Sequence, residues 1–212
     1  MDGEITIQQA RELVRDERRW PLVRKFLYGF AALIDDERVV AACGREAVAL
    51  RGVPRVAAFV RERLAVRPLF HAFPKDDGSR LLLLPVATFR QLALWLAALA
   101  NAERMKREID GGKVRAFRSQ LPGVYPEVFR VAPYFHKWRL PGTGGTDFAV
   151  EGFRLLTTAL KGLPGGLLER QRLRFPAALD EGFTPLDAEV GLDLVYRLLE
   201  LQFPEEHALC CS

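Results

Sequence analysis

Cysteine is scarce in this sequence and is not arranged to build disulfides. The chain of 212 residues has three cysteines, Cys43 and the adjacent pair Cys210 and Cys211. Adjacent cysteines rarely bond to each other, and the evenly spaced framework of small secreted proteins is missing. The pattern predicts a reducing cytoplasm as the location of the protein, with the two terminal thiols exposed.

Hydrophobic runs of membrane-spanning length are missing as well. The apolar stretch "FRQLALWLAALA", residues 89–100, contains Arg90 and Gln91 and is followed closely by charged residues. A transmembrane helix needs about 20 apolar residues, so this stretch is too short. The N-terminal residues "MDGEITIQQARELVRDERRW" are charged and lack the apolar core of a signal peptide. We therefore expect no direct membrane insertion.

Recognisable catalytic, metal-binding and cofactor-binding motifs are also absent. The glycine-rich "PGTGGTD" has neither the lysine nor the spacing of a P-loop, and no predicted strand precedes it. His71, His136 and His207 form no pair at metal-ligand spacing. No Cys or Ser lies in a recognisable nucleophile context. The sequence predicts a protein that is not an enzyme and has no cofactor, although a helical enzyme with a pocket built from distant residues remains an alternative.

What the sequence does contain is helical periodicity. Strict alternation typical of strands is nearly absent, and the composition, 49% hydrophobic and 27% charged, is that of an ordinary globular protein. We predict an all-α fold with irregular Pro/Gly/aromatic loops, forming a single compact helical domain over residues 1–212. Loop 67–80 is the best candidate for a sub-boundary, and tail 205–212 is expected to be flexible. The aromatic segment 125–138 is expected to cover the core.

The helical spacing predicts a central apolar helix over residues 86–110. Trp95, Ala98, Ala102, Met105 and Ile109 recur at spacings of three and four and share one stripe. The stretch 89–100 lies in this helix, so its apolar character predicts burial in the core. Further helices are expected at 6–19, 21–34, 37–50, 54–66, 113–121, 148–161, 165–175 and 185–203, and the "RLRF" at the end of 165–175 alternates like a strand.

Charge is unevenly distributed along the chain. The formal net charge is +4, yet residues 177–212 hold eight acids and one base. Patches of opposite sign steer association with different partners, whereas the simpler interpretation is that these faces are only solvated. As a hypothesis, one basic and one acidic surface dock two partners. The residues assigned to them are Arg104, Lys106, Arg107, Lys113, Arg115 and Arg118, and Glu189, Asp193 and Glu200.

Nucleic-acid binding is an alternative use of the basic region 104–139. Its lysines and arginines are interleaved with aromatics such as Phe117 and Trp138, which together can neutralise phosphates and stack on bases. However, acids including Glu103 and Glu108 interrupt the run, and no helix-turn-helix or RNA-binding signature accompanies it. A helical nucleic-acid-binding or regulatory protein therefore stays an alternative, and no nucleic acid is expected.

Two segments of the sequence resemble a known family. The longer is "LLLLPVATFRQLALWLAALANAERMKREIDGGKVRAFRSQLPG", in which a Leu/Ala-rich helix runs into an Arg-bearing end, breaks, and continues as a short basic helix. The second is "LLERQRLRFPAAL", a basic, Leu-alternating segment that ends in proline. Both are similar to the SctK family (YscK, PscK, MxiK, OrgA) of bacterial type III secretion systems.

The resemblance implies a cytosolic, non-enzymatic component of the sorting platform beneath the injectisome. Members of this family link the cytoplasmic domain of an inner-membrane ring protein, of SctD type, to the pod protein, of SctQ type. On this basis we expect a cytoplasmic adaptor, peripheral to the inner-membrane face of the secretion apparatus. The residues that match lie at about 81–121 and 167–179.

Overall fold

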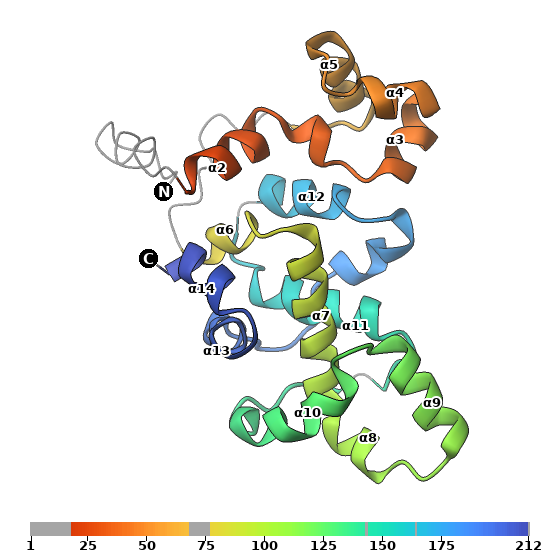
Figure 1. Cartoon of the computed structure of the whole chain (residues 1–212), viewed down its shortest axis with the longest axis vertical. Coiled ribbons are helices and arrows are strands. Elements are labelled where there is room, and N and C mark those ends of the chain that lie inside the picture. Colours follow the sequence, from red (N-terminus) through yellow and green to blue (C-terminus); the bar gives the residue numbers. More distant parts are fainter. Residues whose placement is uncertain (1–17, 68–76, 143, 164, 212) are drawn as a thin grey trace. The chain divides into compact units, whose positions relative to one another are not determined.

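The computed structural model describes residues 18–67, 77–142, 144–163 and 165–211 (Figure 1). Every regular element within these ranges is a helix, which confirms the predicted all-α class. The chain divides into two compact units: unit 1 comprises Met1–Leu84, Leu163–Ala178 and Ala208–Ser212, and unit 2 comprises Pro85–Gly162 and Leu179–His207. The single domain stays a prediction, and most of the helix expected at 6–19 lies outside the described residues.

Unit 1 contains mostly short helices. They are α2 (Trp20–Leu27), η1 (Phe30–Leu33), α3 (Asp36–Cys43), α4 (Arg45–Leu50), α5 (Pro54–Arg63), α6 (Asp77–Leu81) and α12 (Gly165–Leu173). The continuous helices predicted at 21–34 and 37–50 are wrong, because each is interrupted at a glycine. Gly44 lies between α3 and α4 with φ of 88°, in the left-handed region that favours glycine.

A buried arginine of α12 holds unit 1 together at the end of α2. Arg170 is only 4% exposed, and its guanidinium donates hydrogen bonds to the backbone carbonyls of Phe26, Leu27 and Arg67 at 2.7, 3.0 and 2.9 Å. It also lies over the ring of Phe30, 5.0 Å from the centroid. The last carbonyls of a helix lack partners within that helix, so Arg170 satisfies groups that α2 leaves free.

Arg174, just beyond the end of α12, likewise donates hydrogen bonds to backbone carbonyls, here in the segment after α6. It is 6% exposed and donates to the carbonyls of Leu82 and Leu84, each at 2.8 Å, and to Gln171 Oε1 at 2.7 Å. Burial lowers the pKa values of Arg170 and Arg174 to about 10, so both remain charged at neutral pH. The strand-like alternation of "RLRF" is wrong: the segment is the end of a helix followed by a turn.

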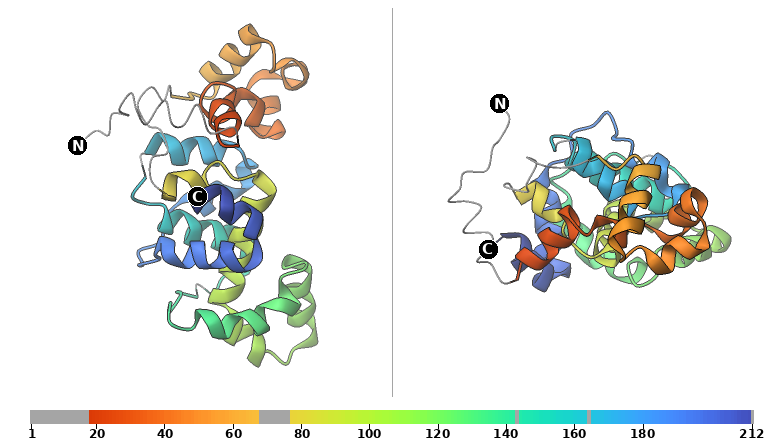
Figure 2. Two further views of the ribbon diagram at one scale, coloured as in Figure 1. Left: turned by 60° about the vertical axis from the view of Figure 1, so that its left-hand side comes forward. Right: turned by 90° about the horizontal axis from the view of Figure 1, so that it is seen from above.

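Unit 2 is built around α7 (Val86–Ala100). The remaining helices within it are α8 (Ala102–Arg107), α9 (Gly111–Gln120), α10 (Tyr125–Val131), η2 (Ala132–Phe135), α11 (Phe148–Ala159) and α13 (Leu192–Gln202). Two further elements, η3 (Ala177–Phe183) and α14 (Pro204–Cys211), cross the boundaries between the units. Figure 2 shows α13 beside α11, against which it packs. The last helix was predicted at 185–203, but in the structure it begins only at Leu192.

The apolar stretch 89–100 is the core helix of unit 2, as predicted. Thr88, Phe89 and every residue from Leu92 to Ala98 are buried. α11 packs closely against α7 (Figure 1): a Cβ atom added to Gly152 would lie 2.0 Å from the carbonyl oxygen of Ala93. The small residues Gly152 and Ala93 thus let the backbones of α11 and α7 approach each other closely. Among the described residues, no helix has both the length and the apolar character required to cross a membrane.

The continuous helix predicted over 86–110 is wrong, because α7 ends at Ala100 and α8 begins at Ala102. Between them lies Asn101, which is 2% exposed, and its Nδ2 donates to Ala97 O at 2.9 Å and to Glu151 Oε1 at 2.8 Å. Asparagine side chains compete with helical backbone bonds in this way. α8 then stops at Arg107, so Ile109, predicted on the buried stripe, is 96% exposed.

The end of the chain differs from the exposed thiols that were predicted. Residues 204–211 form α14, and Cys210 is 1% exposed. The carbonyl of Cys210 accepts a hydrogen bond from Arg80 at 3.1 Å, and both residues belong to unit 1. The expectation of an exposed thiol is therefore wrong for Cys210.

Candidate functional site

A groove of about 1080 Å³ lies within unit 2, between the ends of α7 and α8 on one side and α10 and η2 on the other. Buried and half-buried apolar residues form its floor: Leu99, Ala100, Ala102, Met105 and Phe135. Aromatic residues and proline form its walls: Tyr125, Phe129, Pro133 and Trp138. Charged and polar residues surround it: Glu103, Lys106, Glu108, His136 and Arg139. We call this set of residues the groove.

The wall on α10 and η2 follows from helical spacing. Tyr125, Phe129 and Ala132 are separated by four and three residues, so they share one face. The inward residues Val128 and Val131 are buried, and α10 packs against α7 and α8. The rings of Tyr125 and Phe129 meet edge to face, with centroids 5.3 Å apart. One face of α10 therefore anchors the helix while another presents aromatic rings to the groove.

Trp138 is fixed at the other wall by an acidic residue of α13. Its Nε1 donates to Asp193 Oδ2 at 2.6 Å, and its ring lies 5.5 Å from that of buried Phe135. The ammonium of Lys137 lies 3.9 Å from the Trp138 ring centroid. These contacts hold the indole of Trp138 in one orientation where it lines the groove.

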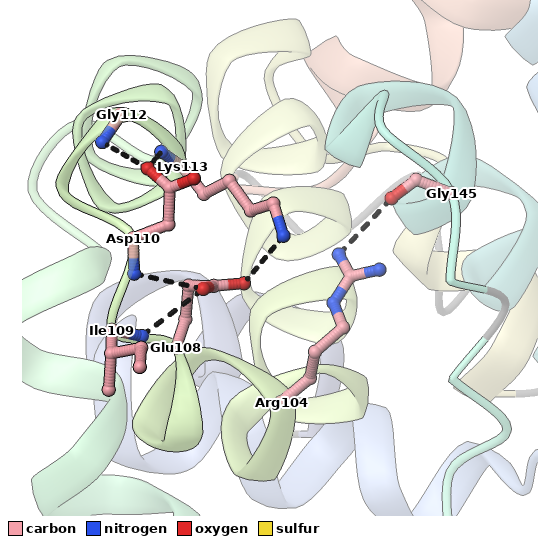
Figure 3. Close-up of polar contacts among 7 residues, drawn as sticks. All are labelled: Arg104, Glu108, Ile109, Asp110, Gly112, Lys113 and Gly145. Atoms are coloured by element: carbon pink, nitrogen blue, oxygen red, sulfur yellow. Dashed lines mark hydrogen bonds and ion pairs between the residues drawn. The ribbon is translucent and has the colours of Figure 1, made fainter.

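The lip of the groove, residues 108–113, is tied together by a carboxylate (Figure 3). Glu108 Oε1 accepts hydrogen bonds from the backbone N–H groups of Ile109 and Asp110 at 3.1 and 3.0 Å, and its Oε2 pairs with Lys113 at 3.4 Å. The hydrogen bond from the Asp110 backbone, helped by Lys113, holds the pKa of Glu108 below its ordinary value. Glu108 is therefore ionised at neutral pH.

A second carboxylate begins α9 at the same lip. Asp110 is the N-cap of this helix, and its Oδ1 accepts from the N–H groups of Gly112 and Lys113 at 2.7 and 3.3 Å (Figure 3). Caps of this kind stabilise helices by about 1 kcal/mol. Together the two carboxylates define the path of the lip and leave Ile109 almost fully exposed.

Arg104, predicted as a partner-binding residue, belongs largely to the fold. Its Nη2 donates to the carbonyl of Gly145 at 3.1 Å (Figure 3), and its guanidinium lies 5.6 and 5.8 Å from the ring centroids of Phe117 and Phe148. Contacts of this kind between a cation and aromatic rings are favourable. The side chain is half-buried, so it links α8 to α9 and to the start of α11.

The other five predicted basic residues lie on α8 and α9 and are exposed: Lys106, Arg107, Lys113, Arg115 and Arg118. Only Lys106 lines the groove, and Lys113 pairs with its lip. Arg107 lies 3.6 Å from Glu103, and Arg118 lies over the Tyr125 ring at 5.5 Å. Of these five bases, the structure therefore places Lys106 at the groove and Lys113 at its lip, and the role of all five in binding stays a hypothesis.

The three predicted acidic residues are not equivalent. Asp193 and Glu200 lie two turns apart on α13, whereas Glu189 precedes this helix and is exposed. Asp193 accepts a hydrogen bond from Trp138, and Glu200 forms an ion pair with Arg197 at 2.5 Å. Of the three, Glu189 is the one for which no bond to the described residues is observed.

The aromatic groove walls were not assigned to a site from the sequence. The aromatic segment was expected to cover the core, and Phe135 does so, being 4% exposed. Tyr125, Phe129 and Trp138 are instead half-buried at the groove. The spacing of 125, 129 and 132 was the available signal, and it was obscured because the prolines and glycines around it predicted irregular structure.

The comparisons with known proteins add no relative. No protein-family model matches the sequence, and neither a curated protein nor a solved structure matches it significantly. Within the part of the chain that the structure describes, no three His, Cys, Asp or Glu side chains gather as they would around a metal ion.

Proposed function

We propose that the chain is a non-enzymatic cytoplasmic adaptor of SctK type, which joins the cytoplasmic domain of an SctD-type ring protein to an SctQ-type pod protein in a type III secretion sorting platform. The observation that carries this proposal is the groove of unit 2. Its apolar floor, aromatic walls and charged surround are the arrangement found at protein interfaces, where a dry centre is enclosed by a polar rim.

The segments that resemble the SctK family support the proposal to different degrees. The first, residues 81–121, includes α7, α8 and α9, and so supplies much of the groove and all six predicted basic residues. The second, residues 167–179, includes the buried arginines Arg170 and Arg174. We expect the first segment to meet a partner and the second to maintain the fold.

Calorimetry with the two proposed partners tests this function. The purified chain is titrated with the ring protein's cytoplasmic domain and with the pod protein from the same cell, at two salt concentrations. We expect both to bind, and at least one complex to weaken at the higher salt because exposed charges are screened. A folded chain that binds neither partner overturns the adaptor function.

The variant Lys106→Glu provides the matched test of the groove in that experiment. Lys106 is exposed, lines the groove and forms no ion pair with described residues, so its reversal should leave the fold intact. We expect weaker binding of one partner and unchanged binding of the other. A chain that instead binds DNA or heparin with a steep salt dependence supports the nucleic-acid alternative.

A further inference from the structure

We infer that the groove of unit 2 binds an amphipathic helix whose apolar stripe is flanked by acidic residues. This inference deepens the proposed adaptor function and rests on it, because it names the chemistry of the partner segment. The shape of the groove, the bases around it that lack ion pairs, and the fixed position of its walls support such an occupant.

The shape favours a helix face. Small residues, Ala100, Ala102 and Ala132, leave space between the aromatic walls. An amphipathic helix presents apolar anchors at i, i+3 or i+4, and i+7, which fit a continuous apolar channel of this kind. The volume, about 1080 Å³, lies just above the range of small-molecule pockets, roughly 300 to 1000 Å³. Several side chains of one helix can therefore enter.

The charges favour an acidic occupant. The two acids that line the groove already have basic partners in the chain: Glu103 pairs with Arg107, and Glu108 pairs with Lys113. Two exposed bases that also line it, Lys106 and Arg139, form no ion pair with any described residue. Carboxylates on a bound helix would pair with them, and such complementarity gives specificity and faster association.

The same groove suits a nucleic acid less well. A nucleic-acid backbone carries a phosphate at every nucleotide, whereas the groove offers two exposed bases without an ion pair to described residues, Lys106 and Arg139. The floor includes the buried residues Ala102, Met105 and Phe135. Aliphatic side chains bind favourably there, because burial of apolar surface stabilises the complex. An acidic helix satisfies both the floor and the free bases.

The walls are also held in place before a partner arrives. Asp193 fixes the indole of Trp138, and the Glu108 and Asp110 carboxylates fix the lip. A binding surface that is ordered in advance loses less conformational freedom on association. This favours selection of one helix with a defined pattern over indiscriminate apolar binding.

The test is a selection of displayed helical peptides on the full-length chain. A library with random residues around a helical apolar stripe is panned at physiological salt, and enriched peptides are synthesised with a fluorophore for anisotropy titration. We expect enriched peptides to carry acids beside aliphatic anchors. No enrichment, or enrichment of neutral or basic peptides, overturns the inference.

Matched variants assign the binding to the groove. We expect the double reversal Lys106→Glu/Arg139→Glu to weaken the selected peptides by about tenfold or more, and Phe129→Ala to weaken them similarly. Arg115→Glu is the control, because Arg115 is exposed on α9 but does not line the groove, and we expect less than a twofold effect. Equal losses in the reversal and the control overturn the inference, as does displacement of the peptides by a single-stranded oligonucleotide at comparable concentration.

The result is separable from the proposed secretion role. If acidic peptides bind the groove but the ring and pod proteins do not bind the chain, the adaptor function fails while the groove chemistry stands. If the ring or pod protein binds and its complex is insensitive to the double reversal, the groove chemistry fails while the adaptor function stands.

Discussion

Arg170 and Arg174, in α12 and just beyond its end, and the exposed arginines of α8 and α9 occupy opposite environments, although both sets belong to short basic segments. Arg170 and Arg174 are 4% and 6% exposed, and their guanidinium groups donate to backbone carbonyls. The side chain of Arg107 is 81% exposed and pairs loosely with Glu103. A basic segment therefore indicates neither a docking surface nor a solvated face until the direction of its side chains is known.

The two sets also contribute differently to stability. A buried guanidinium costs desolvation, which is what lowers the pKa values of Arg170 and Arg174 to about 10, and the cost is offset by several charge-assisted hydrogen bonds. An exposed ion pair is worth about 0 to 1 kcal/mol. We therefore expect Arg170 and Arg174 to determine whether unit 1 folds, and the exposed arginines Arg107, Arg115 and Arg118 of α8 and α9 to have little effect on folding.

Arg174→Met should give the largest effect. It removes the donors to the carbonyls of Leu82 and Leu84, which lie among buried residues, and we expect a loss of about 3 to 5 kcal/mol in the free energy of unfolding. Urea denaturation followed by circular dichroism measures it. Arg115→Met, on the exposed face of α9, is the matched control and should change stability by less than about 0.5 kcal/mol. Similar losses in the two variants would contradict the comparison.

Gly152→Ala tests how unit 2 is held together instead. Its core relies on close approach of α7 and α11, and a methyl group at Gly152 would clash with the Ala93 carbonyl. We expect a loss of about 3 kcal/mol, at the upper end for overpacked cores. Gly162→Ala serves as control, since a Cβ there meets nothing within 4 Å. A stable Gly152→Ala variant would show that the two helices can separate without cost.

Asn101→Ala addresses the buried polar link of unit 2. The substitution removes the hydrogen bond that Asn101 Nδ2 donates to Glu151 Oε1, and we expect a loss of about 2 kcal/mol in the free energy of unfolding. A double-mutant cycle with Glu151→Gln isolates the pair, with an expected coupling of about 1 to 2 kcal/mol. Purely additive losses would mean that Asn101 acts only through the helix break and not through Glu151.

The sequence predicted the parts of the fold that depend on local pattern. Apolar periodicity located α7, and the helices predicted to start at 54 and 86 do begin at Pro54 and Val86. Failures arose where tertiary contacts overrode the pattern. α7 ends at Asn101, whose side chain donates a hydrogen bond to Glu151, fifty residues away in the chain. The sequence around Asn101 does not reveal such a distant partner.

The candidate site was harder to predict for the same reason. The basic residues of α8 and α9 were recognised as a cluster, but Arg104 turned out to be enclosed by Phe117 and Phe148. The groove depends on the packing of α10 against α7 and α8, which a helical pattern in one segment does not reveal. Trp138 takes its position from Asp193, on a helix far along the chain.

The smallest expected effect is a pH response of the groove lip. Because the pKa of Glu108 is lower in the folded chain than in the unfolded one, its carboxylate stabilises the lip above the ordinary pKa of glutamate, and this contribution is lost as the pH falls through the folded-state value. The amide protons of Ile109 and Asp110 should therefore report, in NMR spectra, a titration whose midpoint lies below the ordinary value.

Two variants separate the causes of that response. The hydrogen bond from the Asp110 backbone is the first cause of the lowered pKa and Lys113 contributes as well, so Lys113→Gln should raise the midpoint and Glu108→Gln should abolish the titration. A midpoint at or above the ordinary value of glutamate would mean that the lip is not held by Glu108. Because Ile109 is exposed and the lip contributes little to the core, the unfolding transition of unit 2 should stay nearly unchanged over the same pH range. If the lip loses order at low pH while unit 2 stays folded, the exposed charges of unit 2 determine the local structure of its surface. The buried arginines of unit 1, in contrast, contribute to the stability of the whole unit.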